Sequence, residues 1–295
     1  LVEFVLRQGH LGGERRFVRA DRALAGIRGH RKLQGSRPAG YRTEVPVEHR
    51  IDAGEFILHI RGRIDGLLAT SADVWVEEIK TVQGGWNRTA DPLHWAQVRF
   101  YAFLYGHEQH LPQLQLRLVY LDLDTDQVTE FHETFTLVEL GDFFTTTTGV
   151  YLDWLRAQQR WAGERNRSIR ALGFPFPTYR PGQRELAVAA YRGLARGNRL
   201  FLAAPTGIGK TISVLFPAVK AVGEGRLEHV FYLTARTVGR GIAERALADL
   251  RRGGLRLRSV TLTAREKVCV RNGEPCDPLS CPLALGYYDR LKPAL

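Results

Sequence analysis

Residues 73–81 read Asp73-Val-Trp-Val-Glu-Glu-Ile-Lys-Thr81, and this stretch decides the fold of the first half of the chain. Apolar and polar residues alternate along much of it, with the period of two that is typical of a β-strand. Glu78 and Lys80 are two positions apart, so their side chains leave the same face of the sheet. Residues 55–65 predict a preceding strand that ends on Asp65. We therefore expect Asp65, Glu78 and Lys80 to meet at one place.

These three side chains suggest a chemistry. Two carboxylates that converge on one point make a hard oxygen site for Mg²⁺ or Mn²⁺. An ammonium beside them can position water and stabilise charge on a phosphate under attack, which indicates a hydrolytic phosphodiesterase site. The alternative is an exposed strand with ordinary ion pairs, and the three residues alone favour neither interpretation.

The surrounding segments predict a small α/β domain. Alternation predicts strands, and apolar residues at helical spacing predict helices. The expected elements are a helix over 3–33 that contains His30, a strand over 43–47, a helix over 92–105, and a hairpin of 114–122 with 127–135. Asp124 and Asp126 fall in the hairpin turn, where a hydrophilic turn is favoured over metal ligation.

This arrangement resembles the RecB-like branch of the PD-(D/E)XK nucleases. The motifs that carry the resemblance are His30, Thr43-Glu-Val-Pro-Val47, Gly62-Arg-Ile-Asp-Gly66, Glu78-Ile-Lys-Thr81 and Gln97-Val-Arg-Phe-Tyr101. The resemblance implies a mixed sheet flanked by helices and a DNA-cutting site. The cysteines that hold an iron–sulfur cluster in some RecB-like nucleases are absent from this half of the chain.

The same resemblance assigns roles to residues. His30, Asp65 and Glu78 would bind the metal, together with the carbonyl of Ile79, and Lys80 would be the catalytic ammonium. Gln97 and Tyr101 lie one helical turn apart on a shared face, where they would buttress the site or touch the DNA backbone.

A second motif, Ala204-Pro-Thr-Gly-Ile-Gly-Lys-Thr211, predicts a nucleotide phosphate loop. Backbone N–H groups from Thr206 to Thr211 (Thr206, Gly207, Ile208, Gly209, Lys210 and Thr211) would wrap the phosphates of ATP. Lys210 would reach the β and γ oxygens, and the Thr211 hydroxyl would sit on Mg²⁺. An apolar run from Leu200 predicts a strand before the loop, and a helix is expected over 211–222. A simple strand-to-helix turn is the alternative.

Upstream of this loop, Tyr179-Arg-Pro-Gly-Gln183 precedes a predicted helix over 184–194. Prolines preset the turn and leave Tyr179, Arg180 and Gln183 free to point at a common spot. A glutamine amide can pair with the edge of adenine, while aromatic or guanidinium planes can stack on it. We expect adenine recognition here, with a solvent-facing helix cap as the alternative.

The second half resembles the XPD/DinG branch of superfamily-two helicases from Phe174 onward. The resemblance is carried by the two motifs above, by Tyr232-Leu-Thr-Ala-Arg-Thr-Val238 at the end of a predicted strand over 228–234, and by a cysteine cluster. It implies a partial RecA-like P-loop lobe that moves along single-stranded DNA. Thr234, Arg236 and Thr237 would hold the DNA backbone, since hydroxyl, guanidinium and amide groups bind phosphate without reading sequence.

Cys269, Cys276 and Cys281 are the three cysteines of the chain. Their clustering favours a metal over a disulfide. By the helicase resemblance they are ligands of a [4Fe–4S] cluster in an insertion of the lobe, with a fourth cysteine beyond Leu295. A Zn²⁺ site and plain buried cysteines are the alternatives.

Composition and the distribution of apolar residues limit the kind of partner and the cellular location that the sequence predicts. The 295 residues carry a net charge of +11, which favours a polyanionic partner such as DNA, although a solvated basic surface has the same composition. No apolar run has membrane-spanning length and no signal peptide opens the chain, which predicts a cytoplasmic protein. The chain begins at Leu1 and has no methionine, so we expect a fragment of a longer protein.

We expect two domains, a nuclease over 1–165 and an incomplete helicase lobe over 166–295. A helix over 138–161, interrupted by the threonine-rich residues 143–148, would lead to a polar boundary at 163–168. The hypothesis is an ATP-dependent DNA helicase fused to a metal-dependent nuclease. The alternatives are a P-loop ATPase with an inactive nuclease-like domain that only binds DNA, and a P-loop regulator that uses ATP as a switch.

Overall fold

The computed structural model describes residues 1–12, 20–83, 86–235, 237–271, 274 and 276–294. They form two compact units, the first made of 1–154 with 263–295 and the second of 155–262. Compact units need not coincide with functional domains, so the limits 1–165 and 166–295 stay a prediction.

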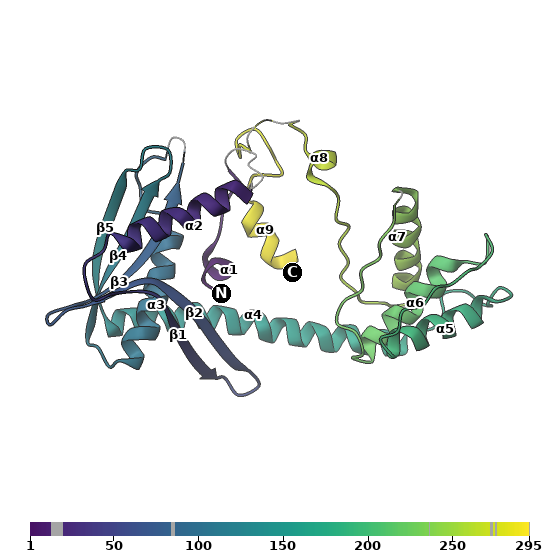
Figure 1. Cartoon of the computed structure of the whole chain (residues 1–295). Coiled ribbons are helices and arrows are strands. Elements are labelled where there is room, and N and C mark those ends of the chain that lie inside the picture. The colour runs from purple at the N-terminus through teal and green to yellow at the C-terminus, as the bar shows by residue number, and fades with distance from the viewer. Residues whose placement is uncertain (13–19, 84–85, 236, 272–273, 275, 295) are drawn as a thin grey trace. The chain divides into compact units, whose positions relative to one another are not determined.

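A single five-stranded mixed sheet forms the centre of the first unit (Figure 1). In order across the sheet, its strands are β1 (Tyr41–Asp52), β2 (Ile57–Ala69), β3 (Val74–Val82), β4 (Gln113–Asp122) and β5 (Val128–Thr136). Neighbours are antiparallel except β3 and β4, which are parallel. A parallel pair needs a crossover connection, which is α3 (Pro92–Glu108). The strands and the helix expected in this half are thus confirmed.

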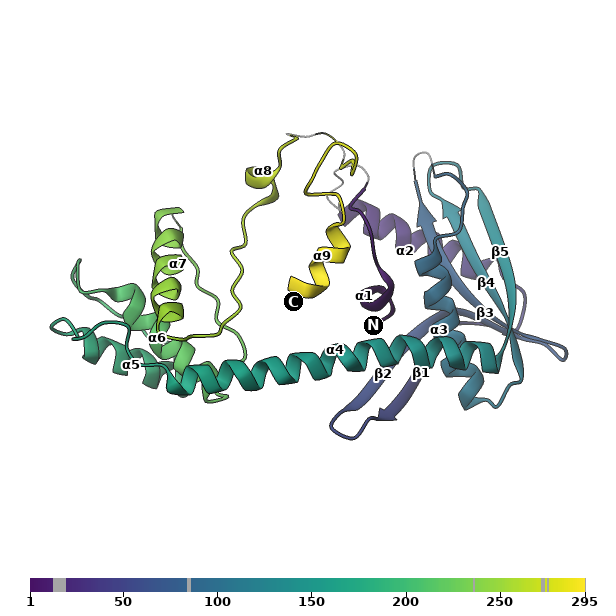
Figure 2. The same cartoon turned by 180° about the vertical axis from the view of Figure 1, so that it is seen from behind.

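Two helices cover opposite faces of the sheet. Leu33 of α2 (Ala20–Gly35) packs on Ile79 and Val119. The alternate positions Leu118 and Tyr120 belong to the large core that contains the buried residues of α3. Figure 1 shows α2 nearer the viewer, and Figure 2 shows the molecule from behind with α3 nearer. Since adjacent residues of a strand face opposite sides, β3 presents Glu77 toward α2 and Glu78 toward α3.

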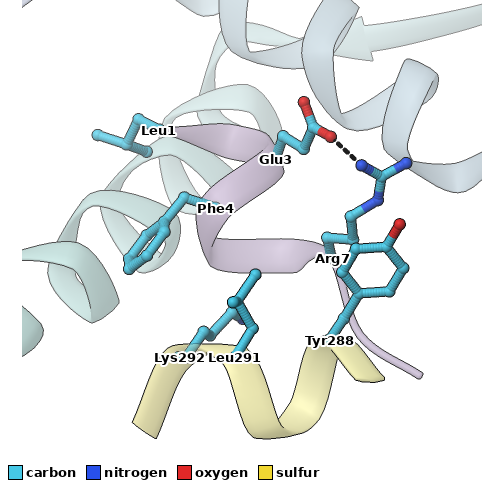
Figure 3. A pocket seen from close by; sticks show the side chains of 7 residues that line it. All are labelled: Leu1, Glu3, Phe4, Arg7, Tyr288, Leu291 and Lys292. Atoms are coloured by element: carbon cyan, nitrogen blue, oxygen red, sulfur yellow. Dashed lines mark hydrogen bonds and ion pairs between the residues drawn. The ribbon is translucent and has the colours of Figure 1, made fainter. Parts of the chain in front are cut away.

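The predicted helix over 3–33 is divided in the structure. Helix α1 (Val2–Leu6) is separate from α2, and residues 13–19 lie outside the described residues. In the same unit, α8 (Arg265–Val268) is followed by α9 (Tyr287–Ala294), which lies beside α1. Figure 3 shows a pocket between α1 and α9, lined by Leu1, Glu3, Phe4, Arg7, Tyr288, Leu291 and Lys292.

Helix α4 (Leu137–Ala171) corrects one expectation. The predicted break at 143–148 is absent, because Thr147 and Thr148 are buried and the Thr148 hydroxyl donates to the Phe144 carbonyl at 2.8 Å. A threonine that bonds back to the preceding turn can stay within a helix. The polar segment 163–168, at which the domain boundary was predicted, also lies within this helix. Neither α4 nor any other helix among the described residues combines the length and apolar character needed to cross a membrane.

The second unit is built around three further helices, α5 (Gln183–Ala195), α6 (Lys210–Gly223) and α7 (Thr237–Arg252). Its core joins α6 and α7 to the end of α4 through Ile169, Leu215, Val219 and Leu250. The helices predicted over 184–194 and 211–222 are confirmed.

The strands expected before the phosphate loop and over 228–234 were wrong. No strand is present among the described residues of the second unit. Both segments are extended but exposed, with Phe201 at 96% and Leu233 at 89% of full exposure. Their apolar pattern favours a buried strand, but a strand also needs a hydrogen-bonding neighbour. No described segment of this unit provides one, and a RecA-like lobe therefore stays a prediction.

Candidate active site

A gap between β2 and β3 creates the site. The ladder between these strands runs from Ala69–Val74 to Gly66–Glu77 and then stops. Two residues beyond Glu77, the Ile79 N–H donates to the side chain of Asp65, with 2.8 Å between nitrogen and Oδ2. A carboxylate therefore replaces the backbone partner that a continued ladder would supply. Asp65 is fixed at the point where the strands diverge.

Glu78 and Lys80 lie on the same side of β3, as their spacing predicts. Glu78 is buried at 2% exposure, and Lys80 Nζ is 2.5 Å from Glu78 Oε1. The ammonium also donates to Gln97 Oε1 of α3 at 3.0 Å. The lysine side chain keeps 24% of its exposure. Its charge is therefore held in place by two acceptors and still reaches the surface.

The surroundings of the two acids raise the pKa of both carboxyl groups. Burial, followed by the nearby Asp65 charge, raises the pKa of Glu78 to about 7. Burial also raises the pKa of Asp65, against the lowering effects of the Ile79 N–H, His30 and Lys80. Two carboxylates that are costly to ionise together become easier to ionise when a cation lies between them.

Helix α2 brings two side chains to Asp65. His30 Nδ1 is 3.9 Å from Asp65 Oδ2, so the predicted histidine does reach the acids. Gln34 Nε2 donates to the Asp65 carbonyl at 2.9 Å. Sequence reasoning missed Gln34. Its spacing of one helical turn from His30 was the available signal, since residues four apart share a helix face.

Helix α3 closes the other side. Tyr101 lies over Gly62 of β2, where a Cβ atom would come within 2.5 Å of the ring. Burial and the negative Glu78 raise the pKa of Tyr101, while a hydrogen bond with Gln97 opposes them. The structure thus gathers Gln97 and Tyr101 at the site. Their contact with DNA stays a prediction.

His94 was also missed and stands one turn before Gln97. Its Nδ1 is 2.8 Å from the Tyr120 hydroxyl, which accepts from the Asp91 N–H at 2.9 Å. The tautomer of His94 decides which of the two groups donates in this bond. Burial, followed by the Lys80 charge, lowers the pKa of His94. The surroundings of His94 therefore disfavour the charged form of its ring.

The oxygen donors present fit Mg²⁺ or Mn²⁺. No group of three or more His, Cys, Asp or Glu side chains is gathered for a metal anywhere in the described part of the chain. Mg²⁺ does not require such a cage, because it keeps several waters and commonly takes one or two carboxylates. Asp65 and Glu78 supply two carboxylates. Their raised pKa values show that both are costly to ionise without a cation beside them.

The predicted nucleotide residues meet in the second unit. Lys210 Nζ donates to the carbonyls of Ala204 and Pro205 at 3.0 and 2.8 Å. Gly207 and Gly209 have φ near +86° and +85°, a conformation that glycine adopts without strain. The buried Gln183 accepts from the Arg180 N–H at 3.0 Å, and the Arg180 guanidinium donates to the Gly207 carbonyl. The Tyr179 ring stacks on Phe174 instead.

The remaining predicted residues are those expected to bind DNA and an iron–sulfur cluster. Thr234 follows an exposed segment, Arg236 lies outside the described residues, and Thr237 begins α7. Cys281 is buried, while Cys269 and Cys276 are half-buried. The cysteines take part in no metal-binding group among the described residues. The iron–sulfur cluster, the zinc alternative and the DNA-binding threonines stay predictions.

The first unit thus combines a mixed sheet, an acid where two strands diverge and a Glu-x-Lys pair on the second of these strands. The profile of the PD-(D/E)XK nuclease superfamily matches residues 6–187. The chain belongs to this superfamily.

Part of the chain is also similar to a solved structure. The crystal structure of SSO0001 is similar at 24% identity and a TM-score of 0.33. The match covers 45% of this chain and 62% of that one. No curated protein matches. The superfamily assignment therefore depends on the profile match and concerns the nuclease fold alone.

Proposed function

We propose that the first unit is a metal-dependent nuclease of the RecB-like kind, which hydrolyses phosphodiester bonds in DNA. One observation carries the proposal, namely that Asp65, Glu78 and Lys80 converge where β2 leaves β3. Membership of the PD-(D/E)XK superfamily supports the reaction class. The net charge of +11 supports a polyanionic substrate.

Each residue then has a chemical task. Asp65 and Glu78, with His30 and the Ile79 carbonyl nearby, would hold Mg²⁺ or Mn²⁺. When bound, such an ion lowers the pKa of water and offsets charge on the phosphate. Lys80 donates to a phosphate oxygen or orients the attacking water, since its ammonium carries three protons and two are already directed by Glu78 and Gln97. Gln97 keeps the ammonium in that direction.

The test is Mn²⁺-dependent cleavage of DNA by the wild type and by Asp65→Asn. The amide can still accept from the Ile79 N–H, so the substitution removes charge with little change in shape. We expect Mn²⁺ binding to weaken and cleavage to fall by about 10- to 100-fold or more. Asp126→Asn is the matched control, because Asp126 is an exposed acid in a turn. Equal losses in both variants would count against the site.

A DNA-binding module without catalysis is the alternative within this class. It would bind DNA with and without metal and leave the strand intact. Wild-type protein that retains DNA but releases no cut product, across Mg²⁺ and Mn²⁺, would favour this alternative over the nuclease.

We further propose that the second unit binds ATP, as part of an ATP-dependent DNA helicase similar to the XPD/DinG branch. The supporting observation is that Arg180 and Gln183 lie against the glycine loop, although the two motifs are separated in sequence. A Cβ atom at Gly209 would overlap the Gln183 amide, so loop and glutamine are closely fitted. Helix α6 begins at Lys210 and directs its positive end toward the loop.

Lys210→Ala is expected to weaken ATP binding by roughly 10- to 150-fold, since hydrogen bonds to charged groups contribute about 1.5–3 kcal/mol. Lys267→Ala, which alters an exposed lysine elsewhere, should bind ATP as the wild type does. Fluorescence titration with a labelled ATP analogue measures both. Unchanged affinity in Lys210→Ala would exclude the phosphate-loop role.

A further inference from the structure

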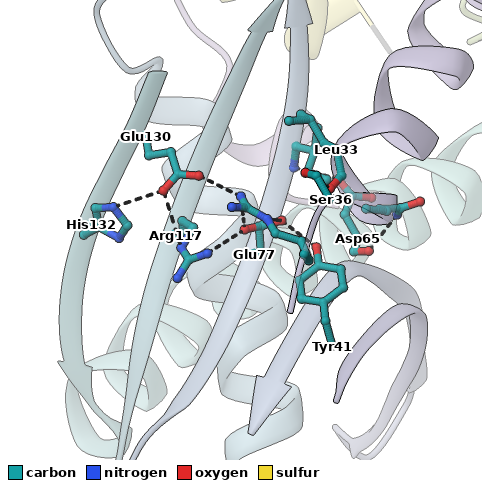
Figure 4. Close-up of polar contacts among 11 residues, drawn as sticks. Leu33, Ser36, Tyr41, Asp65, Glu77, Arg117, Glu130 and His132 are labelled. Atoms are coloured by element: carbon teal, nitrogen blue, oxygen red, sulfur yellow. Dashed lines mark hydrogen bonds and ion pairs between the residues drawn. The ribbon is translucent and has the colours of Figure 1, made fainter. Parts of the chain in front are cut away.

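A cluster of charged and polar side chains around the buried Glu77 lies on the α2 face of the sheet, opposite the face of Glu78 (Figure 4). We call it the Glu77 cluster, and it consists of Glu77, Arg37, Tyr41, Arg117 and Glu130. Glu77 is 2% exposed and accepts from three donors. They are the Arg37 guanidinium, through Nη2 at 2.6 Å and Nε at 3.2 Å, the Tyr41 hydroxyl at 2.5 Å and Arg117 Nη1 at 3.2 Å. Glu130 supplies the second carboxylate, 2.8 Å from Arg37 Nη2.

The cluster is directly connected to the backbone of both acids. Glu77 immediately precedes Glu78, and it pairs in register with Gly66, which immediately follows Asp65. Tyr41 reaches Glu77 by passing over Gly66, where a Cβ atom would overlap the tyrosine hydroxyl. The Gly66–Glu77 pair is the last of the ladder before the gap. It is therefore held in place by side chains on the α2 face of the sheet.

The cluster also fixes the helix that carries His30. Arg37 follows the end of α2 at Gly35, so its bond to Glu77 ties this end of the helix to β3. At Gly29 the helix comes so near the sheet that a Cβ atom would be 2.9 Å from a Leu121 methyl group. His30 and Gln34 lie between these two anchors. Their positions relative to Asp65 thus depend on where Arg37 holds the helix.

We propose that the Glu77 cluster is a positioning device for the metal site, setting His30 and Glu78 relative to Asp65. This inference rests on the proposed nuclease function and deepens it. Buried ion networks are costly to desolvate, and apolar residues of similar volume would often hold a fold equally well. A role in setting the geometry of the site explains why five polar side chains gather on the α2 face at the Gly66–Glu77 pair, which borders the site.

The experiment uses Tyr41→Phe, which removes one hydroxyl and keeps the ring over Gly66. Its matched control is Tyr105→Phe, because Tyr105 is a buried tyrosine of the same unit and its hydroxyl accepts from Arg42 at 2.9 Å. Mn²⁺ binding is measured directly on the whole chain, from the electron paramagnetic resonance signal of free Mn²⁺. Thermal unfolding and DNA cleavage are measured beside it.

We expect Tyr41→Phe to weaken Mn²⁺ binding about 10-fold, as loss of groups that orient metal ligands does, and Tyr105→Phe to leave it unchanged. Glu77→Gln, where it folds, should weaken binding further. Equal Mn²⁺ affinity in folded Tyr41→Phe and wild type overturns the inference, as does an equal loss in both tyrosine variants. Wild-type protein that binds no Mn²⁺ overturns the proposed function as well, whereas wild-type binding and cleavage with an unaffected Tyr41→Phe overturn the inference alone.

Discussion

Replacing Lys80 with alanine is expected to lower the rate of Mn²⁺-dependent DNA cleavage by about 100- to 1,000-fold at saturating metal. The ammonium is the only proton donor among the three converging side chains when both acids are ionised. Glu78 and Gln97 hold the ammonium at 2.5 and 3.0 Å. Because this position depends on both bonds, no other, mobile side chain is expected to take the place of Lys80. Single-turnover cleavage measured with excess protein separates this effect from DNA binding.

Lys32→Ala is the matched control for this substitution. Lys32 also lies in the first unit, but its partner is Asp126 and its side chain is 61% exposed. Removing either lysine lowers the net charge equally, so any general loss of attraction for DNA appears in both variants. Cleavage by Lys80→Ala at the wild-type rate would remove Lys80 from the mechanism.

The metal-free protein is expected to lose stability as the pH rises from about 4.5 to about 7. The cause is Glu78, whose pKa is raised from 4.5 to about 7 by burial and by Asp65. In this window the folded state binds more protons than the unfolded state, so the free energy of unfolding falls with increasing pH. A shift of this size corresponds to on the order of 3 kcal/mol, and the raised pKa of Asp65 acts in the same direction.

Calorimetric unfolding of the metal-free wild type and Glu78→Gln between pH 5 and 8 measures the effect. The variant should show a smaller decrease, because its amide does not titrate. Mn²⁺ should raise the unfolding temperature of the wild type more at pH 8 than at pH 5, since the ionised acids bind the cation. A wild type and a variant with parallel pH profiles would contradict the assignment to Glu78.

The first unit was largely predictable because its signals are local. Alternation along residues 73–81 fixes which side chains share a face, and Asp91 and Pro92 mark the start of α3, where the Asp91 side chain accepts from the Leu93 N–H. The bond between Asp65 and the Ile79 N–H was not predictable. It depends on where the β2–β3 ladder ends, which no spacing within either strand specifies.

The Glu77 cluster escaped sequence analysis for a related reason. Its members come from α2's end, β1, β3, β4 and β5, and they meet only after the sheet has formed. Nothing in the sequence next to Glu77 indicates that its side chain is buried. Glu77 would ordinarily be expected to face water, since charged residues are rarely buried unless paired.

The errors in the predicted secondary structure have their origin in local patterns. Residues 228–234 have the composition of a buried strand, yet strand formation depends on a neighbour that the pattern does not supply. Residues 143–148 are β-branched in part, and helical context outweighed that weak preference. The phosphate-loop residues were placed better, because glycines with positive φ and a helix start are signals of backbone geometry.

The side-chain bond from Asp65 to the Ile79 N–H restricts which mutations this position tolerates. Only a short side chain with an acceptor oxygen reaches that amide, and glutamate is one methylene too long for the same geometry. Asparagine is the single neutral residue that keeps the bond and the length. At position 65, loss of the charge without loss of this bond is therefore confined to one substitution, and a descendant of this protein that is inactivated at this position and still folds should carry asparagine there.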